Sequence, residues 1–296
     1  MSTNSSFGAN IFGVFGRNAS GANSSGEKPG IMQQLIYAAV LILVVYYTLV
    51  FVQVIYNYMN RLSMNRTILL ANTYIIDNKA VNIPQNPNVT GSKTINLSDN
   101  ERTGIEFSYS FYLNVNPSTF RQEQGLLHIF HKGYSSQFPL LAPGVYLRSD
   151  TNTLRVYMNT YRTWNNYVEV SDFPLGKWVH VAIVCKDHSL EIYINGNLSR
   201  KMSYEGFAPY QNYQDICCFS QRRFALKKTI IPSLDEDTSV FGCVKGMLSR
   251  LTYFSYALCY AEIQQIMNEG PSSKIDSSEM NDVPPYLADN WWTKPF

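Results

Sequence analysis

The sequence is poor in charged residues. Asp, Glu, Lys and Arg make up 16% of its 296 residues, against roughly 25% in an average soluble domain. The formal net charge is only +2, which gives no reason to expect nucleic acid as a partner. Basic residues do cluster at Arg222, Arg223, Lys227 and Lys228, but the acidic run 235–237 follows closely. We therefore expect a locally neutralised loop at this place.

Cysteines are few and are not spaced for a metal site. They are Cys185, Cys217, Cys218, Cys243 and Cys259. No C-x-x-C pair occurs, so a zinc site has little support. The odd number argues against a framework in which every thiol is paired. We expect mostly buried free thiols, with room for one bridge.

Catalytic motifs are also lacking. No nucleophile pattern such as G-x-S-x-G accompanies the four histidines. His128 and His131 stand three apart, so on a regular strand their side chains diverge and make poor joint metal ligands. We expect His180 to be a core or rim histidine with its hydrogen bonds satisfied. The sequence thus predicts no enzyme.

Metal and cofactor signals are weak. Asp150, Asn152 and Asp187 are candidate calcium ligands, but no EF-hand-like spacing supports a calcium site. We therefore predict neither a metal nor a cofactor.

One hydrophobic run is long. Residues 35–52 read LIYAAVLILVVYYTLVFV, inside an interval between Lys28 and Arg61 that carries no charge. The run shows no polar face, and about 20 such residues span the ~30 Å hydrocarbon layer of a bilayer. A cleaved signal peptide fits less well, because the interval is too long and starts far from the first residue. We predict a permanent single transmembrane helix over 31–58, of undecided orientation.

The segments on either side of this helix differ from the rest of the chain. Residues 1–30 are rich in Gly, Asn and Ser and are predicted to be disordered. Residues 59–91 are predicted to form a stalk, and residues 271–296 an extended tail that ends in NWWTKPF. Aromatic side chains of the two ends are candidates for partner docking: Phe7, Phe12, Phe15, Trp291, Trp292 and Phe296.

The region 92–270 shows the period of two that is typical of β-strands. In GIEFSYSFYLNVNP, every second residue from Ile105 to Val115 is apolar. GKWVHVAIVCKDHSLEIYINGN reads as two strands, followed by the Asn195-Gly196 pair that favours a tight hairpin turn. Turn signals separate further short strands, which indicates an all-β sandwich. A short helix, YAEIQQIMNEGP, closes the domain.

Three stretches resemble the laminin G-like and pentraxin-like jelly rolls. FSYSFYLNVNPS resembles their early strand, with Tyr112 at the usual Trp position. GKWVHVAIVCKDHSLEIYINGNL resembles their central hairpin, and GMLSRLTYFSYALCYAEIQQIMNEG their closing strand and short helix. The resemblance implies an antiparallel jelly roll of the concanavalin A-like lectin/glucanase superfamily. An acidic residue expected near Ser249 is missing, so a family-type calcium or sugar site is not predicted.

This resemblance leaves several functions open. Membrane-anchored members also resemble virion structural proteins of large DNA viruses with an internal membrane. The leading hypothesis is a non-enzymatic protein with a lipid bilayer and capsid-type neighbours as partners, which links an inner virion membrane to the capsid shell. A glycoside hydrolase is a weaker alternative, because the E-x-D-x-x-E pattern of glucanases is missing. Glu169 and Asp172 would fall on opposite faces of a strand.

A cell-surface lectin is the second hypothesis. The stretch MNTYRTWNNYVEV combines aromatic rings with amides, as a glycan site requires. A second core layer and loop plugs would use the same aromatic residues. The candidate carbohydrate- or partner-binding residues are Tyr157, Tyr161, Trp164, Asn165, Asn166 and Tyr167.

Overall fold

The computed structural model describes most of the chain. The residues described are 30–76, 79–96, 98, 105–204, 206–232 and 234–276, with the backbone alone at 58–64. Contacts divide the chain into two units, Met1–Met59 and Asn60–Phe296, and each is treated by itself. The predicted docking residues lie outside the described residues: Phe7, Phe12, Phe15, Trp291, Trp292 and Phe296.

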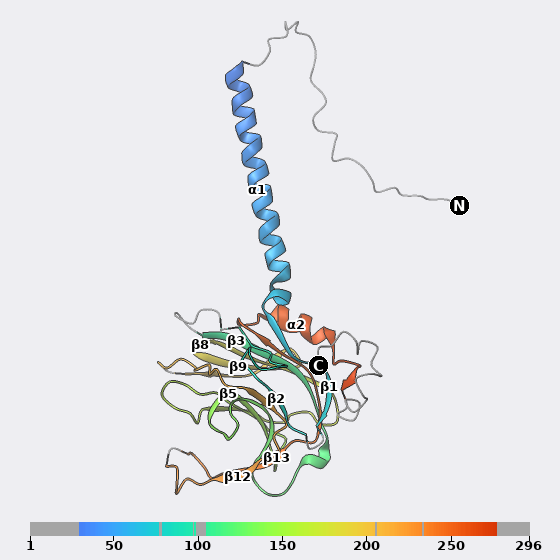
Figure 1. Ribbon diagram of the computed structural model, residues 1–296, viewed down its shortest axis with the longest axis vertical. Helices are drawn as coiled ribbons and strands as arrows, with labels where there is room; N and C mark the ends of the chain where they lie inside the picture. The colour runs from blue at the N-terminus through green and yellow to red at the C-terminus, as the bar shows by residue number, and fades with distance from the viewer. Residues whose placement is uncertain are drawn as a thin grey trace, which may run out of the picture. The chain divides into compact units, whose positions relative to one another are not determined.

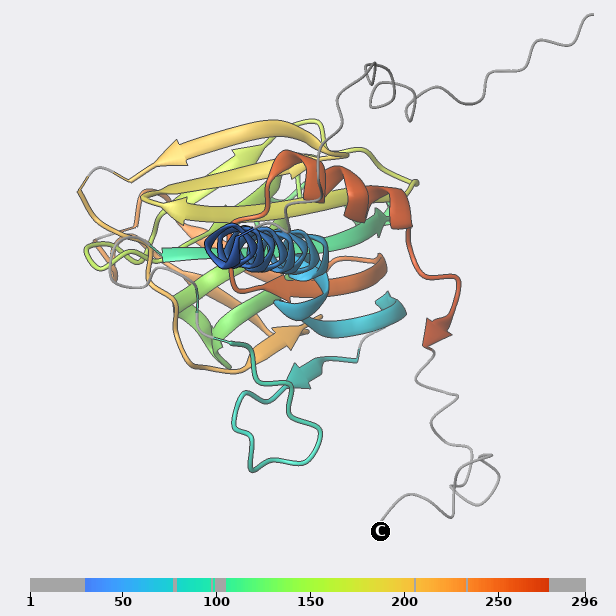
Figure 2. The same cartoon turned by 90° about the horizontal axis from the view of Figure 1, so that it is seen from above.

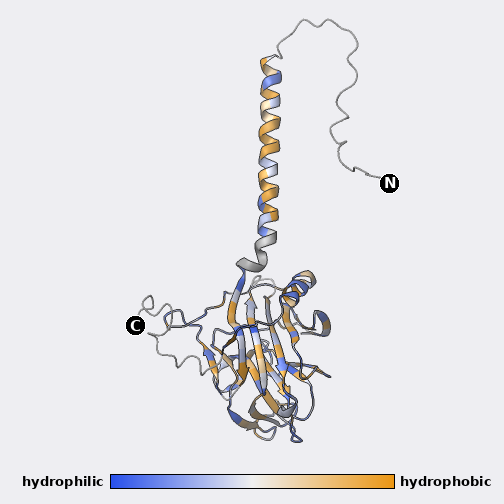
Figure 3. Cartoon of the chain, turned by 90° about the vertical axis from the view of Figure 1, so that its right-hand side faces the viewer, coloured by the Kyte–Doolittle hydropathy of each residue, from blue (hydrophilic) through white to orange (hydrophobic). Residues whose placement is uncertain are grey.

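The first unit contains most of a long apolar helix, α1 (Ile31–Met64). Hydrophobic residues predominate along it (Figure 3), and the side chains of 31–57 are exposed to the surroundings. The apolar part, Ile31–Asn57, has 27 residues, which at about 1.5 Å per residue is longer than the ~30 Å hydrocarbon layer. Thr48 donates a hydrogen bond to the Val45 carbonyl at 3.0 Å, so its hydroxyl needs no water. The predicted helix is confirmed, with a length and composition that suit both an anchor and a signal sequence.

The second unit is a sandwich of two sheets that are mainly antiparallel, each with one parallel pair of strands (Figure 1). Sheet A has seven strands in the order β10-β9-β8-β3-β14-β1-β15. Its strands are β1 (Arg66–Ile76), β3 (Ile105–Val115), β8 (Val179–Asp187), β9 (Ser189–Ile194), β10 (Asn197–Ser203), β14 (Gly246–Phe254) and β15 (Ile275–Asp276). Within sheet A, neighbouring strands pair antiparallel except at the short β1–β15 contact. The predicted jelly-roll class is confirmed.

Sheet B has eight strands, with the main path β12-β13-β4-β5-β6-β7, with β11 paired to β4 and with β2 paired to β11. These strands are β2 (Val81–Ile83), β4 (Leu126–Tyr134), β5 (Gln137–Arg148), β6 (Leu154–Tyr157), β7 (Tyr167–Val170), β11 (Ile216–Cys218), β12 (Arg223–Leu226) and β13 (Thr238–Cys243). A short 3-10 helix (Pro117–Thr119) follows β3.

Aromatic side chains join the two sheets in the core. Tyr109 and Phe111 of β3 are fully buried, and their rings lie 5.9 and 5.3 Å from the ring of Phe130 on β4. Each such side chain contributes roughly 1.5–3 kcal/mol by leaving water. The period of two in β3 therefore determines which side of sheet A packs on sheet B.

The opposite face of sheet A is covered as well. Helix α2 (Tyr260–Glu269) lies across it (Figure 2). The Tyr112 hydroxyl, which points to this side, donates to the Ile266 carbonyl at 2.6 Å, and Ile263 packs among buried apolar residues of sheet A. Gly270 ends the helix with a φ of 69°, as the sequence predicts.

The predicted central hairpin is confirmed. β8 and β9 pair from Val181 to Lys186, and β10 follows through the turn at Asn195 and Gly196, whose φ values are 48° and 76°. Both angles are positive, as a two-residue hairpin turn of type I′ requires. The Asn195 side-chain oxygen also accepts a hydrogen bond from the His180 backbone N–H at 3.0 Å.

The structure corrects the stalk predicted over 59–91. Residues 66–76 form β1, which pairs antiparallel with β14 and buries Leu69 and Leu70. Residues 81–83 form β2, which pairs with β11. The alternation in RTILLANTYII fills a place in sheet A, and the sandwich therefore begins well before residue 92.

All five cysteines are free thiols. Cys185 and Cys218 are buried, Cys217 and Cys243 are partly buried, and Cys259 is exposed. Burial raises the pKa of the Cys185 and Cys218 thiols, which keeps both protonated and unreactive.

Candidate binding site

Sheet B carries a second apolar layer on its outer face. Val156 of β6 faces the main core, so the next residue, Tyr157, faces outward. Tyr157 is buried there against Tyr146 and Phe138, at ring distances of 5.6 and 5.1 Å. Two segments, the loop 158–166 and strand β12, supply Trp164 and Phe224 to the same cluster.

Four of the six predicted contact residues hold this layer and its loop together. Tyr157 is buried, and the ring of Trp164 lies 6.0 Å from the ring of Phe138. Asn166 donates to the hydroxyl groups of Thr160 and Thr163 at 3.2 and 2.5 Å. Tyr167 packs on Tyr157 at 5.4 Å. These side chains act as a second core layer and loop plug, which was the alternative reading of the sequence.

The other two predicted residues lie nearer the surface. Tyr161 has 73% of its surface exposed and contacts the ring of Tyr210 edge to face at 5.2 Å. Asn165 is partly buried, and its side chain lies 3.4 Å from the Asp235 carboxylate. Of the six, Tyr161 is the one whose side chain is mostly exposed, whereas Trp164 and Tyr167 are partly buried.

A second loop joins Tyr161 to form an exposed cluster. A β-bridge links Thr160 to Pro209, and this pairing brings the loop 206–213 beside the loop 158–166. The cluster is called the aromatic rim below, and it consists of Tyr161, Arg162, Phe207 and Tyr210. The Arg162 guanidinium lies 5.1 Å above the ring of Phe207, which is 39% exposed. Sequence reasoning missed the second loop, although the aromatic-rich stretch YEGFAPYQNY was a signal for it.

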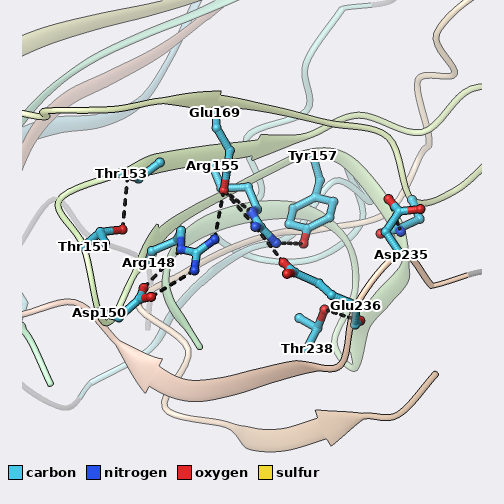
Figure 4. Close-up of polar contacts among 11 residues, drawn as sticks. Arg148, Asp150, Thr151, Thr153, Arg155, Tyr157, Glu169, Asp235, Glu236 and Thr238 are labelled. Carbon is cyan, nitrogen blue, oxygen red and sulfur yellow. Dashed lines mark hydrogen bonds and ion pairs between the residues drawn. The ribbon is translucent and has the colours of Figure 1, made fainter. Parts of the chain in front are cut away.

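The polar half of the outer face is organised around Arg155 (Figure 4). Arg155 is only 3% exposed. Its Nε donates to Glu169 Oε1 at 2.8 Å, and its Nη2 donates to Glu236 Oε1 at 2.8 Å. Its Nη1 lies 3.2 Å from the Tyr157 hydroxyl, and its guanidinium carbon lies 4.2 Å from the centre of the Tyr167 ring.

Arg148 forms a second ion pair beside the first. Its guanidinium donates two hydrogen bonds to Asp150, at 3.1 and 2.9 Å, and lies 3.6 Å from Glu169. Hydrogen bonding from Arg148 lowers the pKa of the Asp150 carboxyl. Together with Arg155 and Glu236, the cluster contains two guanidinium groups and three carboxylates.

The environment keeps the groups around Arg155 in fixed charge states. Burial by itself would lower the pKa of Arg155, but Tyr157 and the two glutamates outweigh it and raise this pKa. Burial raises the pKa of Tyr157 to about 12 against the opposing effect of Arg155. The arginine is therefore charged and the tyrosine neutral at any physiological pH.

The structure corrects the prediction that His128 and His131 diverge. Their Nε2 and Nδ1 atoms lie 2.7 Å apart. The register of β4 shifts between His128 and Phe130, and both Ile129 and Phe130 face the main core. This bulge turns the two histidines to the same side, because it breaks the period of two.

The hydrogen bonds of this histidine pair define its tautomers. The Ser220 backbone N–H donates to His128 Nδ1 at 3.0 Å, so the proton of His128 is on Nε2 and points at His131. His131 in turn donates from Nε2 to the Tyr134 carbonyl at 2.9 Å. Burial lowers the pKa of His131 to about 4 and the pKa of His128 well below its usual value.

His180 lies in the layer between sheet A and α2. Its Nε2 is 2.8 Å from the Ser110 hydroxyl, whereas its buried Nδ1 has no partner in the described part of the chain. The histidine is thus a core residue, as predicted, with one hydrogen bond in place of two. Burial lowers the pKa of His180 to about 4.

Metal ligands do not converge within the described ranges. No group of three or more His, Cys, Asp or Glu side chains is placed to hold an ion there. Asp150, a candidate calcium ligand in the sequence, instead pairs with Arg148. Asp172 has a positive φ of 58° just beyond β7 and does not join Glu169 at the arginine cluster.

Comparisons with known proteins agree with this architecture. The family model described as the concanavalin A-like lectin/glucanases superfamily matches residues 89–217. A comparison with curated proteins finds no match.

Solved structures that partly match this chain include two toxin binding domains. The binding domain of botulinum neurotoxin serotype D is 14% identical at a TM-score of 0.43, over 68% of this chain and 41% of that one. The binding domain of Paraclostridial Mosquitocidal Protein 1 is 14% identical at a TM-score of 0.43, over 70% of this chain and 46% of that one. The alignments thus span less than half of each of those chains.

Proposed function

We propose that this concanavalin A-like sandwich is a non-enzymatic binding module, that α1 anchors it in a bilayer, and that the aromatic rim contacts the partner. The observation that carries the proposal is the exposure of the rim: Tyr161 is 73% and Phe207 39% exposed, although the described core buries most aromatic side chains. Aromatic residues and arginine are the side chains enriched at protein interfaces. The rim combines both within two bridged loops.

The loops of the rim are held in place before any partner binds. The Asn159 side chain accepts from the Leu141 backbone N–H and donates to the Pro139 carbonyl, both at 2.7 Å. The Tyr210 backbone N–H donates to the Asn159 carbonyl at 2.8 Å. A preorganised surface loses less conformational entropy on binding. The ordered loops therefore support a role of the rim in binding a partner.

Two kinds of partner fit the rim. A capsid-type protein next to an inner virion membrane is the finer proposal, supported by the single apolar helix, the low charge and the free thiols. A glycan is the alternative, because exposed tyrosine rings can stack on sugar faces while neighbouring polar groups orient the ligand.

A glycoside hydrolase is the weakest alternative. Glu169 and Glu236 do approach each other, since both accept hydrogen bonds from Arg155. The pocket that Glu236 lines, however, measures only about 20 Å³. This volume holds about one or two water molecules and not a sugar ring.

The test compares the rim with a matched exposed tyrosine on α2, Tyr260, which is 61% exposed. A photo-crosslinking amino acid replaces Tyr161 or Tyr260 in the full chain, in the cell or particle that produces it. We expect one partner to be crosslinked from position 161 and not from 260. A glycan array with the full chain in detergent tests the lectin alternative. If the partner is a glycan, glycan binding should fall about tenfold or more in Tyr161→Ala but not in Tyr260→Ala. Equal crosslinking from both positions, or glycan binding that is unchanged in Tyr161→Ala, would contradict the proposal.

A further inference from the structure

We propose that Arg155 marks a second binding site, which receives a glutamate side chain from an acidic segment of a partner protein, and that Glu236 occupies it while the partner is absent. This site uses residues outside the aromatic rim, so the proposal can be tested independently of the function proposed above.

The receiving group is built into the sheet. Three contacts fix the Arg155 guanidinium without any help from Glu236: the Glu169 carboxylate, the Tyr157 hydroxyl and the face of the Tyr167 ring. All three come from β6 and β7, the strands that pair at this point of sheet B. A buried guanidinium with this support is a preorganised receptor for a carboxylate.

Glu236 is the replaceable member of the cluster. Its side chain is 50% exposed, and it reaches Arg155 from the segment 227–237 that connects β12 to β13. Without it, the charges of Arg148 and Arg155 are already balanced by Asp150 and Glu169. The third carboxylate is thus not needed for neutrality, and an exchange of one carboxylate for another conserves the charge of the site.

The segment that carries Glu236 stays in place when this side chain leaves. Its main chain is held by the Lys228 backbone N–H, which donates to the Asp237 carboxylate at 2.7 Å, and by the buried side chain of Leu234. The Lys228 ammonium also donates to the Asp235 carbonyl at 3.2 Å. Rotation of the Glu236 side chain alone therefore opens the site.

Glu236 itself shows which shape of side chain reaches the guanidinium. Its carboxylate stands on a slender aliphatic stem and accepts from Arg155 Nη2 at 2.8 Å. The space left beside it measures about 20 Å³, and Arg148, Arg155, Glu236 and Asp237 are among the residues that line it. In an acidic sugar the carboxylate is bonded directly to the ring and has no such stem. We therefore expect a glutamate of a peptide to bind better than a uronic acid.

The experiment uses the full chain in detergent micelles at low salt. The probe is a fluorescein-labelled peptide with three glutamates separated by glycines, and the same peptide with glutamines is its control. We expect Glu236→Ala to bind the glutamate peptide about tenfold or more tightly than the native chain, because the competing side chain is removed. Glu236→Gln, which keeps the stem and loses the charge, should behave similarly.

Control variants separate this effect from net charge and from folding. Glu269→Ala removes an α2 carboxylate of comparable exposure, which pairs with Arg250 of β14, and it should leave the affinity unchanged. Adding Arg155→Lys to Glu236→Ala should abolish the gain. Free glutarate should displace the peptide at concentrations at which glucuronate does not, a measurement that needs no further substitution.

Three results would overturn the proposal. One is a folded Glu236→Ala chain that binds no better than Glu269→Ala. Another is equal binding of the glutamine peptide. The third is displacement by glucuronate as effective as displacement by glutarate, which would refute the assignment of a peptide side chain.

Discussion

Acid should destabilise this protein well above the pH at which carboxylates protonate. Three of the four histidines, His128, His131 and His180, are buried. Burial lowers the pKa of His131 and His180 from 6.5 to about 4 and lowers the pKa of His128 further. Between pH 6.5 and 4 the unfolded chain therefore binds protons that the folded chain does not. The free energy of unfolding is highest above pH 6.5 and falls as the pH falls.

The lowered pKa values of His131 and His180 set the size of this effect. For a pKa of 6.5 in the unfolded chain and about 4 in the folded chain, each histidine removes about 2 kcal/mol of stability at pH 5. The two together remove about 4 kcal/mol. For a domain of this size, 1 kcal/mol corresponds to roughly 2–4 °C in Tm, so Tm should fall on the order of 10 °C between pH 7 and pH 5.

The assay is thermal unfolding of the full chain in detergent, followed by near-ultraviolet circular dichroism from pH 7 to pH 5. His180→Gln keeps a partner for Ser110 and cannot titrate. The fall in Tm of this variant between pH 7 and pH 5 should therefore be smaller than in the native chain, by about half of the combined effect of His131 and His180. His188→Gln is the matched control, because His188 lies exposed at the β8–β9 turn and should leave the pH dependence unchanged. A native Tm that is the same at pH 7 and pH 5, or an undiminished slope in His180→Gln, would refute the reasoning.

Two further predictions concern the hairpin turn and the helix. Gly196→Ala should lower stability by about 1–2 kcal/mol in chemical denaturation, because φ is 76° and an added Cβ would lie 2.2 Å from the Gln264 amide nitrogen. Gln264→Ala in the same chain should restore part of this loss, and no recovery would show that the backbone angle dominates. If α1 is a permanent anchor, the chain should stay with membranes in alkaline carbonate and keep the mass of the full sequence; loss of the first residues in mass spectrometry would indicate a cleaved signal sequence.

Local patterns were sufficient for much of the fold. The uncharged run 35–52 predicted α1, and the alternation from Ile105 to Val115 predicted which residues of β3 enter the core. Asn195 and Gly196 predicted the hairpin turn. Each of these features depends on residues that are neighbours along the chain, so its physical cause is readable in a short window of sequence.

Prediction failed where the partner is distant or the strand is irregular. β1 was assigned to a stalk because its partner β14 lies far along the chain; Thr73 and Ser249, which hydrogen-bond across the pair, are separated by 176 positions. His128 and His131 were separated by a rule of period two that the bulge in β4 does not obey. For the aromatic stretch 157–167 the sequence left both a glycan site and a second core layer open, because it does not show that sheet B has a covered outer face.

The amino-acid sequence by itself determined that an apolar helix precedes a β-sandwich with a closing helix, since hydrophobic periodicity and turn chemistry act over a few residues. Tertiary structure alone decided which side chains meet. Arg155 and Glu236 stand 81 positions apart, and the two loops of the rim meet at Thr160 and Pro209. Such contacts depend on strand register and on the stacking of two sheets, and no short window of sequence contains that information.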